Sequence, residues 1–146
     1  MCFHDKELRN NPSKPAELRK GRGFSTDNPY AYQAHIYDNT RPEALGFMEK
    51  IRALMDRYPG AVTLGETSAA DSHKAMADYT AGNKRLHMAY SFELLADKLS
   101  GTYIRNTLEL LEEKLGDGWS CVAIGNHDVV RVMSRWGGEQ QSPQLA

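Results

Sequence analysis

Polar residues that could do chemistry follow two short apolar runs in this chain. Glu66 comes directly after residues 61–65, and residues 121–125 lead into the sequence Asn126-His127-Asp128, with Arg131 three residues further on. Buried parallel strands present polar side chains at their C-terminal ends, where neighbouring strands meet. The two runs therefore predict one shared site that contains the carboxylates of Glu66 and Asp128.

Two carboxylates that face a sugar ring can cleave a glycosidic bond. One of them must keep its proton near neutral pH, which burial or a neighbouring negative charge can achieve. A metallophosphoesterase-like hydrolase is an alternative, because Asn and His in a loop like Gly125-Asn126-His127-Asp128 bind metal in that class. The class also needs an Asp-X-His sequence near its start and later histidines, whereas no histidine follows His127. We therefore expect no metal and no cofactor.

Each of these residues also has a purely structural interpretation. Glu66 could be an exposed or helix-capping carboxylate, and Asp128 could cap a helix over residues 129–135. His127 could be an ordinary loop histidine. The functional hypothesis rests on the combination, because both strand ends carry an acid at the same place.

Residues 41–58 carry the signals of an amphipathic helix. Apolar residues recur every three or four positions through the segment, which gives it one apolar face. Thr40 and Glu43 have the spacing of a capping box, and Pro42 suits the first helical turn. Pro59-Gly60 predicts its end.

Helices and strands alternate through residues 41–137. The elements predicted after the first helix are a strand at 61–65, a helix at 71–80, a strand at 86–92, a helix from Ser100 or Thr102 to Gly116, a strand at 121–125 and a helical turn at 129–135. Alternation of this kind predicts a parallel α/β sheet, although three strands do not close a barrel. We expect residues 1–40 to form a long loop with one helical turn near Glu17, and residues 138–146 to form a loose tail.

The composition is that of one globular domain. The chain has 146 residues, of which 40% are apolar and 25% are charged. Its formal net charge is -1 and its basic residues are not clustered, so we expect neither nucleic acid nor a membrane as partner. No apolar run is long enough to span a membrane, and no Gly-rich phosphate loop follows a strand. Cys2 and Cys121 lack metal-binding spacing, and a disulfide between them is not expected.

Several stretches resemble the α-amylase superfamily, glycoside hydrolase family 13, and within it the bacterial α-glucosidase and oligo-1,6-glucosidase branch. Leu64-Gly65-Glu66-Thr67 is similar to the motif of the family's fifth strand, and residues 125–131 to that of its seventh. Residues 35–43 look like the run into the fourth helix, residues 86–92 like the sixth strand, and residues 132–137 like the stretch after the seventh.

The resemblance implies a role for each candidate residue. Glu66 matches the general acid/base, and Asp128 matches the acid that binds ring hydroxyls and stabilises the transition state. His127 and Arg131 fall in the substrate-binding motif, while Asn126 is expected to shape the loop. The implied substrate is an α-linked gluco-oligosaccharide, and the implied location is the cytoplasm.

One motif of the family is missing from the chain. The nucleophilic Asp of the family ends the fourth strand, and residues 3–12 resemble the segment just after it, so Asp5 is not expected to be the nucleophile. The resemblance therefore implies a partial (β/α)8 TIM barrel, from the loop after strand four through strands five to seven. We expect this chain to be inactive alone and to self-associate through open barrel edges. A non-catalytic carbohydrate-binding remnant is the third hypothesis.

Overall fold

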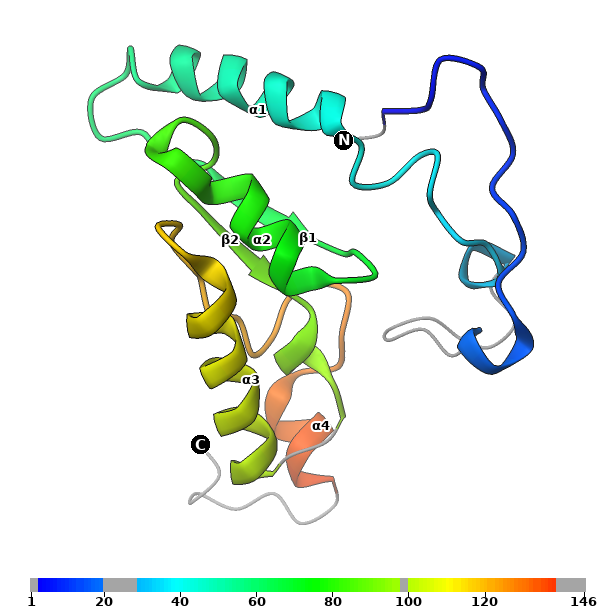
Figure 1. Ribbon diagram of the computed structural model, residues 1–146. Helices are drawn as coiled ribbons and strands as arrows, with labels where there is room; N and C mark the ends of the chain where they lie inside the picture. The colour runs from blue at the N-terminus through cyan, green and yellow to red at the C-terminus, as the bar shows by residue number, and fades with distance from the viewer. Residues whose placement is uncertain (1–2, 20–28, 98–99, 139–146) are drawn as a thin grey trace.

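The computed structural model describes residues 3–19, 29–97 and 100–138 (Figure 1). The α-helices are α1 (Pro42–Met55), α2 (Ser72–Thr80), α3 (Gly101–Leu115) and α4 (Val132–Gly137), and the strands are β1 (Leu64–Thr67) and β2 (Met88–Ser91). Short 3-10 turns are η1 (Ala16–Leu18), η2 (Pro29–Tyr32), η3 (Ala81–Asn83) and η4 (Glu93–Leu95). None of the helices among these residues is long and apolar enough to cross a membrane.

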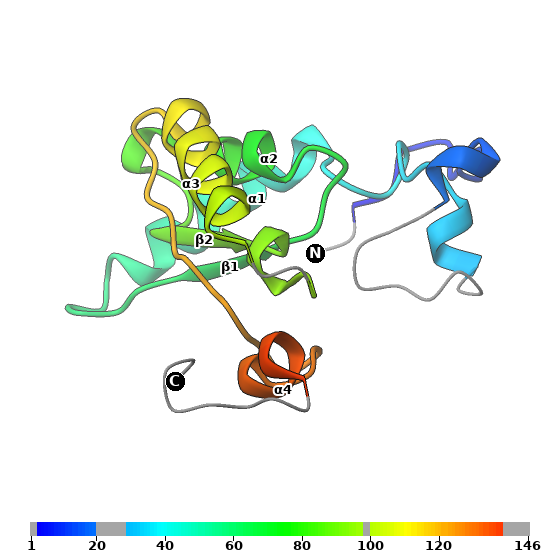
Figure 2. The same ribbon diagram turned by 90° about the horizontal axis from the view of Figure 1, so that it is seen from below.

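The two strands pair in parallel, as the alternation of helices and strands predicted. Leu64 lies opposite Met88 and Glu66 opposite Tyr90. Figure 2 shows α1, α2 and α3 on one side of the strands and α4 on the other. Strand β1 begins later than the strand predicted at 61–65, and strand β2 is shorter than the strand predicted at 86–92. One face of this small sheet therefore packs against helices.

The described residues include no strand at 121–125, so the prediction of a third strand there is wrong. This segment runs beside β2 but forms only one parallel bridge, between Ala89 and Ser120. The N–H of Ala89 donates to the carbonyl of Trp119 at 3.3 Å, and the N–H of Cys121 donates to the carbonyl of Ala89 at 2.8 Å. Parallel strands normally have both faces covered. Here Val122 is exposed on one face, so the segment lacks the packing that would extend the ladder.

Helix α1 begins without the predicted capping box. Its N-cap is Arg41, and no side chain caps the helix. Thr40 has a φ of 49°, which turns its backbone into the left-handed region and away from the extended conformation typical of a capping residue. Glu43 instead forms an ion pair with Arg41, at 3.5 Å between Oε2 and Nε. The helix ends at Met55, three residues before the predicted end.

The predicted boundaries of α2 and α3 are confirmed, whereas the helical turn predicted at 129–135 is found at Val132–Gly137 instead. The Asp71 carboxylate caps α2 by accepting from the N–H of Lys74 at 2.9 Å. The Ser100 hydroxyl caps α3 by accepting from the N–H of Tyr103 at 3.4 Å. Gly116, with a φ of 64°, ends α3. The two helices pack on β2 through a core of Met76, Ala89 and Leu111.

The segment before α1 is mostly irregular, with a helical turn at η1 where one was predicted near Glu17. A single antiparallel bridge joins Ser13 to Gln33, and the N–H of Asp5 donates to the carbonyl of Tyr37 at 2.8 Å. These contacts fold the segment back on itself. The predicted tail at 138–146 lies, except for Gly138, outside the described residues.

Candidate active site

Glu66 lies near the C-terminal end of β1 and receives hydrogen bonds from two other segments. The hydroxyl of Tyr90, on β2, donates to Glu66 Oε1 at 2.6 Å. The side-chain amide of Asn126 donates to the same oxygen at 2.9 Å. Because Glu66 and Tyr90 are register partners on adjacent strands, their side chains point to the same face of the sheet. The end of β1, the end of β2 and the loop after residues 121–125 thus meet at this carboxylate.

The Tyr90 hydroxyl is a stable donor to Glu66. Burial raises the pKa of Tyr90, and the hydrogen bond to the Glu66 carboxylate raises it further, although Asn126 acts in the opposite direction. The net effect is a pKa above the ordinary value, so the hydroxyl keeps its proton well beyond neutral pH. Nothing in the sequence pattern singled out Tyr90 as a site residue; only its register with Glu66 reveals it.

Asn126 connects Glu66 to the second predicted acid. Its side-chain oxygen accepts from the N–H of Asp128 at 3.0 Å, while its amide nitrogen donates to Glu66. A short polar side chain that accepts a backbone N–H two residues ahead stabilises a turn. Asn126 therefore shapes the loop after residues 121–125 and ties it to β1.

His127 and Asp128 follow Asn126 with their side chains exposed, at 3.5 Å between His127 Nε2 and Asp128 Oδ1. The interpretation of Asp128 as a helix cap is wrong. Helix α4 begins only at Val132, its N-cap is Arg131, and no side chain caps it. Asp128 is thus a loop carboxylate near Glu66, and Arg131 is an exposed residue at the start of α4.

Arg135, on α4, holds the same loop at both ends. Its guanidinium donates to the carbonyl of Ile124 at 2.6 Å and to the carbonyl of Val130 at 2.8 Å. A longer contact of 3.4 Å reaches the carbonyl of Leu94 beyond β2. The loop with Asn126, His127 and Asp128 lies between the two closer acceptors. Arg135 was not among the predicted site residues, because an arginine in the last turn of a short helix after a polar loop is a weak signal for such a clamp.

Replacement of Arg135 by Gln should loosen the loop. Each lost hydrogen bond from a charged donor costs about 1.5–3 kcal/mol, and local opening becomes about tenfold more frequent for each 1.4 kcal/mol. We expect the amides of residues 125–130 to exchange with deuterium at least about tenfold faster. Hydrogen-exchange mass spectrometry measures this, with Arg105→Gln on the exposed surface of α3 as the control. Equal exchange in both variants would contradict the clamp.

Among the described residues, no group of three or more His, Cys, Asp or Glu side chains could hold a metal ion. One Asp-X-His sequence does occur, Asp71-Ser72-His73. There Asp71 caps α2, and His73 is a buried residue in the first turn of that helix. Cys121 has a free thiol, and Cys2 lies outside the described residues.

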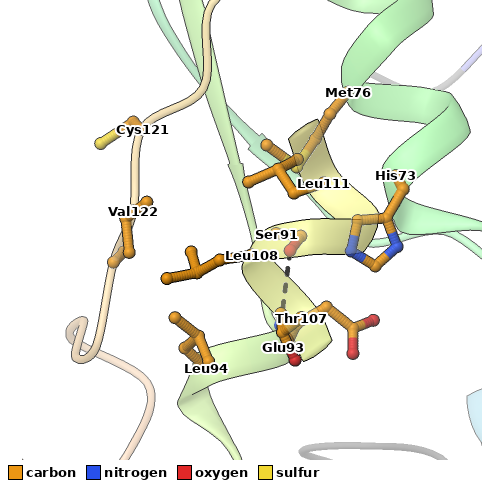
Figure 3. A pocket seen from close by; sticks show the side chains of 11 residues that line it. His73, Met76, Ser91, Glu93, Leu94, Thr107, Leu108, Leu111, Cys121 and Val122 are labelled. Atoms are coloured by element: carbon orange, nitrogen blue, oxygen red, sulfur yellow. Dashed lines mark hydrogen bonds between the residues drawn. The ribbon is translucent and has the colours of Figure 1, made fainter. Parts of the chain in front are cut away.

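The described residues form two cavities near the candidate site whose walls include neither Glu66 nor Asp128. A small one of about 20 Å³ lies between α2, α3 and residues 121–123, with His73, Met76 and Leu111 in its wall (Figure 3). That volume holds about one water molecule. A groove of about 850 Å³ lies between the segment before α1 and the turn after β1, and Tyr30, Asn39, Ser68 and Phe92 are among its lining residues.

Helices on one face of two parallel strands, with Glu66 near the end of β1 and Asp128 in a loop that Asn126 ties to it, are the arrangement of part of an α/β barrel. A family model described as "Alpha amylase, catalytic domain" matches residues 6–145. The chain belongs to this family.

Similar proteins agree with the family assignment. The chain is 43% identical over 138 residues to a probable alpha-glucosidase of Rhizobium meliloti, covering 92% of this chain and 25% of that protein. It is 25% identical to Maltase 1 of Drosophila virilis, covering 92% of this chain and 22% of that protein. It matches the crystal structure of XgtA, an alpha-glucosyl transfer enzyme, with a TM-score of 0.89 and 59% identity, covering 97% of this chain and 26% of that one.

The chain therefore spans about a quarter of the length of these relatives. The predicted family and the predicted partial (β/α)8 barrel are both confirmed. The metallophosphoesterase hypothesis has no support in these matches. The roles of the individual site residues stay a prediction.

Proposed function

We propose that this chain carries the acid/base and sugar-binding part of the active site of a retaining enzyme that acts on α-linked glucose. The observation that carries the proposal is the position of Glu66, which is held by Tyr90 and Asn126 beside the loop of Asp128. In retaining glycosidases one carboxyl group protonates the leaving oxygen while a second attacks the anomeric carbon. Glu66 is the proton donor in this proposal.

The hydrogen bonds to Glu66 suggest which of its oxygens carries the proton. Tyr90 and Asn126 both donate to Oε1, and an oxygen that accepts two donors is the one that bears the negative charge. Oε2 is then the oxygen that gives a proton to the departing sugar and later takes one from water. The two donors keep the carboxyl group oriented while its charge changes.

Asp128 and His127 are proposed to bind hydroxyl groups of the glucose ring. Both side chains are exposed at the end of the loop, so they are accessible to a ligand. A carboxylate is an acceptor for two hydroxyls, and it stabilises the positive charge that develops on the ring. Arg131, also exposed, is proposed to contact the part of the substrate beyond that ring.

The nucleophile of the proposed reaction lies outside this chain. Asp5, the acid nearest the sequence of the missing motif, is buried and fully engaged. The side chain and N–H of Arg9 donate to its two oxygens at 2.9 and 3.0 Å. Burial raises the pKa of the Asp5 carboxyl, but these hydrogen bonds outweigh it and hold the pKa below its ordinary value. A carboxylate held in this way is unsuited to attack a sugar, so we propose that the chain alone is inactive.

The substrate is proposed to be an α-linked gluco-oligosaccharide, with water or a second hydroxyl compound as acceptor. The names of the relatives support both reactions, because one is named a probable alpha-glucosidase and another an alpha-glucosyl transfer enzyme. The same covalent intermediate serves both reactions, and only the attacking hydroxyl differs.

A hybrid enzyme tests the proposal. In the hybrid, the segment of XgtA that aligns with this chain is replaced by residues 1–146, so XgtA supplies the rest of the barrel. We expect the hybrid to cleave 4-nitrophenyl α-glucoside at a rate within about tenfold of XgtA, a difference of 1.4 kcal/mol in the barrier. A hybrid that is folded, as shown by a cooperative thermal transition, yet inactive would refute the proposed function.

A further inference from the structure

His35, in the turn between η2 and α1, has both of its ring nitrogens against acceptors. Its Nδ1 lies 2.9 and 3.1 Å from the two carboxylate oxygens of Asp38, and its Nε2 lies 2.8 Å from the carbonyl oxygen of Tyr30. Neither an ionised carboxylate nor a carbonyl can donate a hydrogen bond, and a neutral imidazole has only one N–H. Only the imidazolium ion, with an N–H on each nitrogen, satisfies both contacts.

The charge on this imidazolium is compensated inside the fold. The His35 side chain is only 11% exposed, and burial alone disfavours a cation. The Asp38 carboxylate offsets that cost because it carries the opposite charge at hydrogen-bonding distance. The Tyr30 ring also stacks on the imidazole, with the ring centroids 3.7 Å apart and the planes 24° from parallel. An aromatic face attracts a cation, so both partners of His35 favour its positive form.

A contact from Asn11 points the other way. Its amide nitrogen lies 3.4 Å from His35 Nδ1, while its side-chain oxygen accepts from the N–H of Tyr37 at 3.0 Å. A hydrogen bond from that amide needs a lone pair on Nδ1. The same lone pair would then face the Asp38 carboxylate at 2.9 Å. The shorter contact, with a charged partner, therefore decides in favour of an N–H on Nδ1.

The contacts of His35 build one wall of the groove at the C-terminal end of the strands. Tyr30 and His35 line this groove together with residues 68–70, which follow β1. The side-chain amide of Asn39 donates to the carbonyl of Ser68 at 3.0 Å, so the turn that carries His35 is tied to the loop just after Glu66. The other charged residues of the groove lining are Lys14, Arg41 and Glu93.

We propose that His35 is a pH-sensitive latch for this wall of the groove. Histidine is the side chain that ordinarily changes charge between pH 5 and 8. Below that range the imidazolium holds η2 and the turn of Asp38 together. As the pH rises through it, the neutral ring keeps its single N–H for the charged acceptor Asp38, and its other nitrogen turns a lone pair towards the Tyr30 carbonyl. Two facing acceptors repel each other, so η2 separates from the turn and the wall loosens.

Hydrogen exchange of the 146-residue chain at pH 5 and pH 8 tests the latch. After correction for the intrinsic pH dependence of exchange, we expect the amides of residues 30–38 to exchange at least about tenfold faster at pH 8, because a hydrogen bond from a charged donor is lost. The amides of α3 should exchange equally at both values, which shows that the fold is intact. The NMR spectrum of ¹⁵N-labelled histidine should show two N–H groups on His35 at pH 5 and one at pH 8.

Three variants separate the latch from a general effect of pH. His35→Gln has no charge at either pH, so residues 30–38 should exchange fast at both values. His127→Gln, at an exposed histidine in another loop, is the matched control and should keep the pH dependence of the unchanged chain. Asp38→Asn keeps the shape of the acceptor without its charge and should release the wall at a lower pH. It decides the question if His35→Gln loses the protection of α3.

The same measurements in the XgtA hybrid should give the same results with the rest of the barrel present. The latch concerns the shape of the groove and does not depend on the roles proposed for Glu66 or Asp128. Equal exchange of residues 30–38 at pH 5 and pH 8 would overturn it. So would a pH dependence that persists in His35→Gln, or a single N–H on His35 at pH 5, because the ring would then not be a cation while the wall is closed.

Discussion

Glu66→Gln in the XgtA hybrid should reduce the rate of maltose cleavage by about 10²- to 10⁴-fold, the usual contribution of a general acid. Gln has the shape of Glu and can still accept from Tyr90 and Asn126, whose donors lie 2.6 and 2.9 Å from Oε1. It cannot give or take the proton. The loss should therefore fall on kcat, with little change in folding. The steady-state kinetics of glucose release measure it.

The leaving group separates an acid/base from the other possible roles of Glu66. A glucosyl fluoride needs little protonation to depart, so the same substitution should slow formation of the intermediate much less with that substrate than with maltose. Glu113→Gln on the exposed surface of α3 serves as the control for loss of a negative charge. An equal loss with both substrates would refute the assignment of Glu66 as the proton donor.

Asp128→Asn should reduce kcat of the hybrid by about 10²- to 10³-fold, the range found when one group that stabilises a developing charge is removed. The substitution keeps the size of the side chain and leaves the backbone N–H free to donate to Asn126 at 3.0 Å. It removes the negative charge that is proposed to face the positively charged sugar ring. Unlike the loss in Glu66→Gln, this loss should be the same for maltose and for the fluoride, because both pass through that charged state.

Asp97→Asn, at an exposed position after η4, is the matched control for Asp128→Asn. The comparison of the two variants separates a local effect from a general effect of charge. If Asp128→Asn kept at least half of the activity on both substrates, Asp128 would not contact the reacting sugar, and the proposed site would lose one of its two acids.

Local features of this fold were predictable from the sequence, because they depend on residues close together in the chain. Asp71 and Ser100 cap their helices through an N–H three residues ahead. The Thr40–Glu43 capping box failed because Thr40 takes a left-handed turn and Glu43 pairs with Arg41. That outcome depends on how the preceding segment enters the helix, which the capping pattern does not encode.

The two candidate acids could be picked out from the sequence, but the hydrogen bonds that Tyr90 and Asn126 donate to Glu66 could not. Glu66 and Asp128 stand out because each follows an apolar run. Tyr90 and Asn126 lie 24 and 60 residues from Glu66 in the chain, and only the pairing of β1 with β2 and the path of the later loop bring them together. The predicted strand at 121–125 failed for a related reason. A strand is completed by neighbours on both sides and both faces, and these contacts lie beyond the segment itself.

The most direct test of the central claim compares the isolated chain with the hybrid on 4-nitrophenyl α-glucoside at equal concentration. If this chain carries the acid/base and the sugar-binding acid but not the nucleophile, the hybrid turns over and the isolated chain gives no rate above background. Turnover by the isolated chain that Glu66→Gln abolishes would contradict the account, because the chain would then contain a complete active site.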